Sequence, residues 1–469
     1  MRRTFRLLPV LAIVFHGFGA RAQTPIDPAF AALLQQKLDS CRNVYDVPGI
    51  SATILLPGDR YWNGATGVAD IYTNEPLDTA HVFQAASTTK LFTATIIFQL
   101  IDEGLLALDD TIGEYLPPMT DIPGDTQLRY LLNHRSGLAD YLQQPGAFNN
   151  WFNFPDSVWP PAQVIGTYHA PPQFAQNAAF SYSNTNFLLL GMVIEAVTGN
   201  TYAQELNARI LAPLGMEDAY FPPGLPIAGA LVPGWTSFSQ PNVYDTDVTP
   251  VLRDCYASFG FAAGAVVIKP NDLARFTRAV MTGALLTPAS LTTMRTCTNV
   301  NFGDGCNGYG HGAMRYVFAG RTYYGHGGDI NGFTQLTIHD QPDSVTLVLS
   351  INRNNAPRGP IAAAMLGVVF EGLSTGLADV RPLAAAFELF PVPATDRVTL
   401  RSAALSTNDR IDLFDATGRM VRSERAASNG AHELNVQGLP PGAYQVRWRS
   451  AHGTRERDPE CSRRMIIAR

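Results

Sequence analysis

The order of the expected strands and helices constrains the fold of this 469-residue chain more than any other feature. Alternating or apolar stretches near residues 50–56 and 61–70 predict strands, and stretches 334–339 and 344–351 predict a strand hairpin far later in the chain. A long helical, loop-rich region lies between them. Because strands need neighbours, we expect one sheet assembled from distant segments, with a cleft beside an all-helical subdomain.

The first segment that suggests chemistry is Ser87-Thr-Thr-Lys90, which opens a predicted helix that stops at Gly104. Lys90 comes one turn after Ser87 and therefore lies on the same face of that helix. A serine needs a base to become a nucleophile, and a lysine removed from water can lose its proton near neutral pH. The alternative is an N-cap serine followed by a solvated lysine. Only Lys37, Lys90 and Lys269 are lysines among 34 lysines and arginines, which favours a special role for Lys90.

A second polar segment, Tyr182-Ser-Asn184, comes before an apolar helix that ends at Gly199. A residue in such a turn can point into a cleft while the helix anchors it. The phenol of Tyr182 can carry a proton to or from the serine, and the amide of Asn184 can orient Lys90 or a substrate. The alternative is an ordinary turn, because Asn and Ser favour turns and Tyr covers cores.

The third segment is His326-Gly-Gly-Asp329, directly before the predicted hairpin. Gly327 and Gly328 would let the backbone approach a ligand closely, and a backbone N–H here could pair with that of Ser87 to form an oxyanion hole. We expect His326 to face the substrate. The alternative is a glycine-rich turn with a surface histidine.

The ordered set Ser-x-x-Lys, Tyr-x-Asn and His-x-Gly resembles the serine β-lactamase and D-Ala-D-Ala-peptidase superfamily. It is most similar to the class C-like branch, which includes D-aminopeptidases and carboxylesterases. The resemblance covers roughly residues 28–375 and implies an α/β (α+β) fold: an antiparallel sheet flanked by helices, with an all-helical subdomain. Flanking segments typical of the family are Val47–Ala52, Phe83–Ala94, Leu131–Leu138, Phe180–Gly191 and Gly325–Gly328.

The resemblance implies a role for each motif residue. Ser87 would be the acylated nucleophile, Lys90 its base and Tyr182 the proton shuttle, with no metal and no cofactor. The substrate would be a small molecule or peptide, attacked in two steps through an acyl-enzyme. The expected substrate-binding residues are Asn184, His326, Gly327, Gly328 and Asp329, with the N–H of Asp329 as the second oxyanion donor.

His326 stands where many members of the superfamily have lysine, and it is a cation only when protonated. The resemblance therefore favours a DD-carboxypeptidase- or esterase-like hydrolase of D-amino-acid peptides, amides or esters. A class C-like β-lactamase is the alternative within the superfamily. A non-catalytic wall- or surface-binding protein on the same scaffold is the alternative outside it.

The N-terminus has the pattern of a secretory signal peptide, residues 1–22. Basic residues precede an apolar run, and Ala20-Arg-Ala22 forms a cleavage site. No later apolar run reaches the length of a membrane span, so we expect a secreted or cell-surface protein without a transmembrane segment. The net charge of −6 offers no basic surface for nucleic acid.

The five cysteines fit an oxidising compartment. Cys297 and Cys306 bracket a short polar loop, and we expect them to form a disulfide. Cys41 and Cys255 are candidates for a second bridge, which leaves Cys461 over. Metal ligation is the alternative, although the spacing matches no zinc pattern.

The chain changes character after Leu383, where short alternating strands separated by Gly and Pro turns predict a small β-sandwich. We therefore expect a hydrolase domain over residues 23–380 and a second domain over residues 385–469. The second domain resembles the C-terminal sorting domain of the type IX secretion system, which implies that the secretion machinery is a partner. A carbohydrate- or wall-binding module is the competing interpretation.

Overall fold

The computed structural model describes residues 23–221, 231–237, 243–251, 254–374, 388–390, 394–401, 405–415, 419–449 and 461–467. The chain divides into two compact units. The first holds Met1–Thr24 and Ala31–Glu371, and the second holds Pro25–Phe30 and Gly372–Arg469. The expected signal peptide and the expected boundary between the domains lie outside the described residues.

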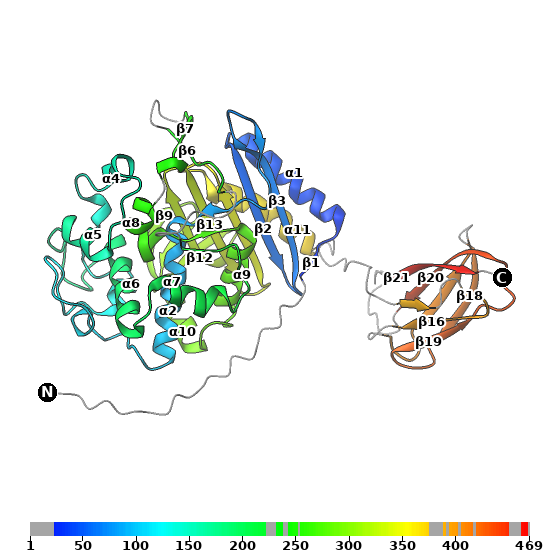
Figure 1. The fold of residues 1–469 in the computed structure, drawn as a ribbon. Coiled ribbons are helices and arrows are strands. Elements are labelled where there is room, and N and C mark those ends of the chain that lie inside the picture. Colours follow the sequence, from blue (N-terminus) through cyan, green and yellow to red (C-terminus); the bar gives the residue numbers. More distant parts are fainter. Residues whose placement is uncertain are drawn as a thin grey trace. The chain divides into compact units, whose positions relative to one another are not determined.

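A large sheet forms the centre of the first unit (Figure 1). Strands from both ends of the unit meet in its middle, where Ser350 of β14 lies opposite Ser51 of β2 in an antiparallel pair. This pairing confirms the expected assembly from distant segments and the expected hairpin, β13–β14. Strand order across the described part of the sheet is β1 (Thr24–Pro25), β3 (Arg60–Asp70), β2 (Gly49–Leu56), β14 (Val345–Ile351), β13 (Phe333–Asp340), β12 (Arg321–Ile330), β11 (Met314–Phe318), β10 (Cys306–Tyr309) and β9 (Thr298–Gly303), with β4 (Glu75–Pro76) beside β3.

Two helices contact this sheet. Helix α1 (Pro28–Val44) lies beside β3, where Gln35 donates a hydrogen bond to the carbonyl of Ala65. Helix α9 (Pro270–Met281) packs against β2, β13 and β14. Its Phe276 stacks on Phe92 of α2 (Thr89–Asp102), with ring centroids 3.6 Å apart. Helix α11 (Arg358–Ser374) follows the sheet's last strand.

The segment between β3 and β9 supplies the helical part of the unit, drawn from cyan to green in Figure 1. Helix α2 is apolar on every side, and its residues from Thr89 to Leu100 are all buried, so it forms the centre of this layer. The mixed fold with an antiparallel sheet and a helical subdomain is therefore confirmed. The other helices of this part are α3 (Leu128–Leu132), α4 (Asn149–Asn153), α5 (Pro161–Thr167), α6 (Asn184–Thr198), α7 (Tyr202–Leu206), α8 (Asp254–Gly264) and α10 (Pro288–Arg295).

The expected Cys297–Cys306 disulfide is absent, and both cysteines are free thiols. The register of β9 and β10 gives the reason. Cys306 lies opposite Gly303, whereas Cys297 comes just before Thr298, which lies opposite Tyr309. The two thiols are therefore at different ends of the hairpin. Cys41 and Cys255 are also free, and both are buried.

The second unit contains two antiparallel sheets that share an apolar core, as expected for a small β-sandwich. Val398, Leu400, Ile411, Leu413 and Leu434 are among its fully buried side chains. One sheet is β15 (Glu388–Phe390), β16 (Arg397–Arg401) and β19 (Ala431–Asn435); the other is β18 (Met420–Arg425), β17 (Arg410–Phe414), β20 (Gly442–Arg449) and β21 (Cys461–Ile467).

Within the described residues, every helix is too short or too polar to cross a membrane.

Candidate active site

Ser87 lies in a strained turn between strand β5 (Phe83–Gln84) and helix α2. The expected single helix begins later than predicted: Ala86–Thr88 form a 3₁₀ turn, and α2 starts at Thr89. Ala86 has φ 48°, a left-handed conformation that a residue with a Cβ seldom adopts. Such strain persists only where the surroundings hold it, and here the Ala85 N–H donates to Val266 O at 2.8 Å.

Lys90 is completely buried and directs its ammonium nitrogen at Ser87. Lys90 Nζ is 3.2 Å from Ser87 Oγ, 2.7 Å from Asn184 Oδ1 and 2.8 Å from Ala263 O. Burial lowers the pKa of Lys90 to about 7, although Asp140 opposes that shift. Near neutral pH, Lys90 can therefore exist without its proton and accept one from a neighbour.

Asp140 fixes the orientation of Asn184. The Asn184 backbone N–H donates to Asp140 Oδ1 at 3.2 Å, and Asn184 Nδ2 donates to Asp140 Oδ2 at 2.9 Å. With its amide nitrogen held in this way, Asn184 must turn its oxygen toward Lys90. The sequence analysis missed Asp140. The available signal was an acid two residues after the Leu131–Leu138 segment, and a tertiary contact brings this acid to the start of α6.

Tyr182 completes the group around Lys90, whose nitrogen lies 5.0 Å from the centroid of the Tyr182 ring. The phenol is buried, and burial holds its pKa well above the usual value. Ser87 is near enough to lower that pKa in part, although the two hydroxyls make no hydrogen bond of good geometry. The phenol is therefore neutral and has a proton to give.

The third motif reaches the site along an open edge of β12. Strand β11 pairs with β12 only as far as Met314, which lies opposite Gly325. Beyond that point the chain runs beside Ser87, where a Cβ added to Gly328 would lie 3.0 Å from Ser87 N and 2.6 Å from Ala85 O. Real Cβ atoms do not approach so closely, so this position requires glycine.

The expectation that His326 faces the substrate is wrong. His326 is fully buried, and its Nε2 lies 3.1 Å from the hydroxyl of Tyr309 on β10. Burial, together with the charges of Lys90 and Arg358, lowers the pKa of His326 to about 3. The imidazole is thus a neutral interior group and supplies no cation to the pocket.

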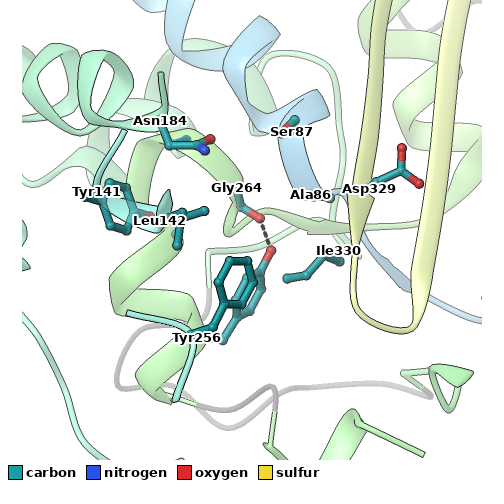
Figure 2. A pocket seen from close by; sticks show the side chains of 12 residues that line it. Ala86, Ser87, Tyr141, Leu142, Asn184, Tyr256, Gly264, Asp329 and Ile330 are labelled. Atoms are coloured by element: carbon teal, nitrogen blue, oxygen red, sulfur yellow. Dashed lines mark hydrogen bonds between the residues drawn. The ribbon is translucent and has the colours of Figure 1, made fainter. Parts of the chain in front are cut away.

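A pocket with about 420 Å³ of empty space, part of it open to solvent, lies beside Ser87 (Figure 2). Among the lining residues that the structure describes, Asp329 is the acid, and none is a lysine, arginine or histidine. The Asp329 carboxylate accepts hydrogen bonds from Thr334 and Arg358. The lining residues are Ala86, Ser87, Tyr141, Leu142, Phe148, Asn184, Tyr256, Gly260, Ala263, Gly264, Asp329 and Ile330.

Two sequence families match this chain. Residues 30–369 match the family described as Beta-lactamase. The chain belongs to the beta-lactamase family. Residues 388–457 match the family described as Secretion system C-terminal sorting domain. The beta-lactamase family match and the geometry around Ser87 make this chain a serine hydrolase.

Individual relatives of this beta-lactamase-family chain have other activities in their names. Penicillin-binding protein 4 of Amycolatopsis lactamdurans is 27% identical over 77% of this chain and 93% of its own length. A D-aminopeptidase of Gluconobacter oxydans is 26% identical over 73% of this chain, which spans 63% of that relative. The solved structure of D-amino acid amidase from Ochrobactrum anthropi SV3, with L-phenylalanine amide, has a TM-score of 0.65 and 27% identity, and the match covers 74% of this chain and 99% of the amidase.

Proposed function

We propose that this chain is an exported hydrolase that forms an acyl-enzyme on Ser87 and acts on D-amino-acid amides, peptides or esters. The observation that carries the proposal is the placement of Lys90: buried, with a pKa of about 7 and within 3.2 Å of the Ser87 hydroxyl. A lysine held in this state is a suitable base for a serine nucleophile.

The mechanism follows from the positions of the named groups. Neutral Lys90 takes the proton of Ser87 while Ser87 Oγ attacks the substrate carbonyl carbon. The oxyanion that forms lies between the backbone N–H groups of Ser87 and Asp329, on the β12 edge. As the intermediate collapses, Tyr182 gives its proton to the departing amine or alcohol and recovers one from protonated Lys90. Water then attacks the ester on Ser87 and releases the acid.

The charges around the pocket favour an amide or ester over a β-lactam. A carboxylate on the substrate would meet no lysine, arginine or histidine among the described lining residues, and it would approach Asp329, whose charge Arg358 offsets only in part. Like charges in a partly desolvated site repel each other. The names of the D-aminopeptidase and D-amino acid amidase relatives support D-amino-acid substrates. A class C-like β-lactamase is the second candidate, supported by the penicillin-binding relative.

The test is time-resolved intact mass spectrometry on the mature protein. D-Phenylalanine amide, a p-nitrophenyl ester and a penicillin are each mixed with wild type and with Ser87→Ala. We expect an acyl adduct and turnover with the amide or ester, and neither with Ser87→Ala. Rapid consumption of penicillin through a short-lived adduct would instead support the β-lactamase. No adduct with any of the three would support the non-catalytic scaffold.

The chain's destination is also part of the proposal. We infer that the segment from residue 388 addresses the protein to the type IX secretion machinery, because it matches a sorting-domain family over residues 388–457. Export to the cell surface or the medium would place the hydrolase among extracellular peptides and esters.

A further inference from the structure

His134 lies at the meeting point of the second and third motifs. It belongs to the Leu131–Leu138 segment, is completely buried and has φ 57°. Its ring packs against the ring of Tyr182, with centroids 4.2 Å apart and planes 31° apart. It is also 4.7 Å from the ring of Tyr309.

His134 holds the backbone on both sides of Tyr182. The His134 carbonyl accepts a hydrogen bond from the Ser181 N–H at 3.0 Å. His134 Nδ1 lies 3.2 Å from the Ser183 backbone nitrogen. A backbone N–H can only donate, so Nδ1 must be the acceptor, and a neutral His134 carries its proton on Nε2.

The proton on Nε2 sets the direction of the next hydrogen bond. His134 Nε2 lies 3.1 Å from the Tyr309 hydroxyl, which must accept from it. The single proton of Tyr309 is then available for His326 Nε2, also at 3.1 Å. At the far end, His326 Nδ1 lies 2.5 Å from the carbonyl of Gly327, which can only accept. His326 therefore carries its proton on Nδ1 and has Nε2 free to accept from Tyr309.

Burial, and to a lesser extent the charges that face the two imidazoles, keeps them neutral. Burial, Lys90 and His326 lower the pKa of His134. Burial, Lys90 and Arg358 lower that of His326, against the hydrogen bond to Gly327. Each ring then has one donor nitrogen and one acceptor nitrogen. All four nitrogens make hydrogen bonds, and these bonds run in the same direction from His134 through Tyr309 to His326.

We propose that His134 and Tyr309 are positioning residues for the hydrolysis. Together with His326 they form a one-way hydrogen-bond chain that ties the turn carrying Tyr182 to the β12 edge carrying Gly328. Since the β12 edge runs so close to Ser87 that a Cβ on Gly328 would lie 3.0 Å from Ser87 N, a small shift of that edge would displace the oxyanion donors. The kinetic consequence rests on the proposed function; the hydrogen-bond directions do not.

The first test needs no substrate. The full chain is labelled with ¹⁵N-histidine, and the imidazole nitrogens are observed by NMR at neutral pH. We expect the Nε2–H tautomer at His134 and the Nδ1–H tautomer at His326, assigned from the resonances missing in His134→Asn and His326→Asn. The opposite tautomer, or an imidazolium, at either residue would contradict the proposed hydrogen-bond chain.

The second test measures kcat and KM with the ester or amide that wild type hydrolyses. Tyr309→Phe removes the middle link. His134→Asn keeps an acceptor for the Ser183 N–H and tolerates the positive φ. It loses the hydrogen bond to Tyr309 together with the ring packing on Tyr182. We expect each variant to lower kcat about tenfold with KM changed less than about twofold, since only the transition state needs the aligned donors. The kcat of the double variant should be no lower than that of the less active single variant, because both substitutions break the same hydrogen-bond chain.

Tyr323→Phe is the matched control, because Tyr323 is a buried tyrosine on β12, the strand that carries His326 and Gly328, and it takes no part in the hydrogen-bond chain. It should keep the wild-type kcat. Full kcat in Tyr309→Phe, or losses that add in the double variant, would contradict the proposal. If wild type shows no hydrolysis that depends on Ser87, the proposed function is wrong. The NMR measurement still tests the hydrogen-bond chain in that case.

Discussion

Lys90 shows how one residue can be chemically defined by what surrounds it. Its position in a helix that is buried on all sides removes water, and the carbonyl of Ala263 and the amide oxygen of Asn184 replace part of that solvation. The remaining desolvation penalty lowers the pKa of Lys90 to about 7. The same side chain on the surface would be a permanent cation.

The pKa of Lys90 leads to a prediction for the pH profile. The base must be neutral, and the neutral fraction falls as the pH drops below the pKa. We therefore expect kcat/KM for a neutral ester to fall about tenfold per pH unit below the Lys90 pKa and to level off above it. Initial rates measured in buffers on both sides of this pKa would give the pH profile of kcat/KM.

Lys90→Arg is the control for that profile, because arginine keeps its charge at all these pH values. It should be inactive throughout. A wild-type profile that is flat from about pH 5 to pH 9 would contradict a base with this pKa.

Gly328 gives the second prediction at this scale. A methyl group at this position meets Ser87 N at 3.0 Å and Ala85 O at 2.6 Å, so Gly328→Ala must push β12 away from the nucleophile. We expect kcat/KM to fall by about 10²-fold, as when an oxyanion donor is lost. The measurement is kcat/KM alongside a thermal melt.

Gly367→Ala in helix α11 is the matched variant, because nothing lies within 4 Å of its added Cβ. It should keep full activity and gain roughly 0.5–1 kcal/mol in unfolding free energy. Equal activity in both alanine variants would show that the β12 edge does not need to approach Ser87.

The register of hairpin β9–β10 determines whether its two cysteines can pair, and this register cannot be read from the cysteine spacing. The spacing of Cys297 and Cys306 suits a disulfide, but the register places Cys306 opposite Gly303 and leaves Cys297 beyond the other end. A bond between them would require the two strands to slip past each other by several residues and would break the observed β9–β10 pairing.

The register predicts a thiol count. When the protein is unfolded without reductant and alkylated, Cys41, Cys255, Cys297 and Cys306 should all be modified, as shown by peptide mass spectrometry. The melting temperature should be unchanged by reductant, because no bridge among these four constrains the unfolded chain. A Cys297–Cys306 peptide pair, or a lower melting temperature with reductant, would contradict this register.

At the scale of the whole molecule, each unit has a hydrophobic core of its own. A chain that stops near residue 385 retains every residue of the proposed site and the whole sheet of the first unit. We expect this truncation to keep kcat and KM within about twofold of the full chain, because domains with separate cores fold independently. Steady-state kinetics on both chains would measure it.

The same truncation tests whether the second unit is a sorting domain. Expressed in a host with type IX secretion, it should remain in the periplasm while the full chain passes the outer membrane. Export of the truncated chain at the full-length level would rule out a sorting role for the second unit.

The sequence by itself determined the ordered motifs, because a nucleophile, its base and a glycine-rich edge need particular residue types at local spacings that a reader can see. It also determined the strand–helix–strand order, since hydrophobic periodicity is a local signal. The hairpin β13–β14, the sheet assembled from distant segments and the C-terminal sandwich were predictable on those grounds.

Only the tertiary structure decided which neighbours each side chain would have. Asp140 came to hold Asn184, His326 turned into the interior toward Tyr309, and the two cysteines fell at different ends of a hairpin. Burial, pKa and hydrogen-bond direction depend on contacts between residues far apart in the chain. No local pattern contains them, so the chemistry of Lys90 and His326 became definite only when the chain had folded around them.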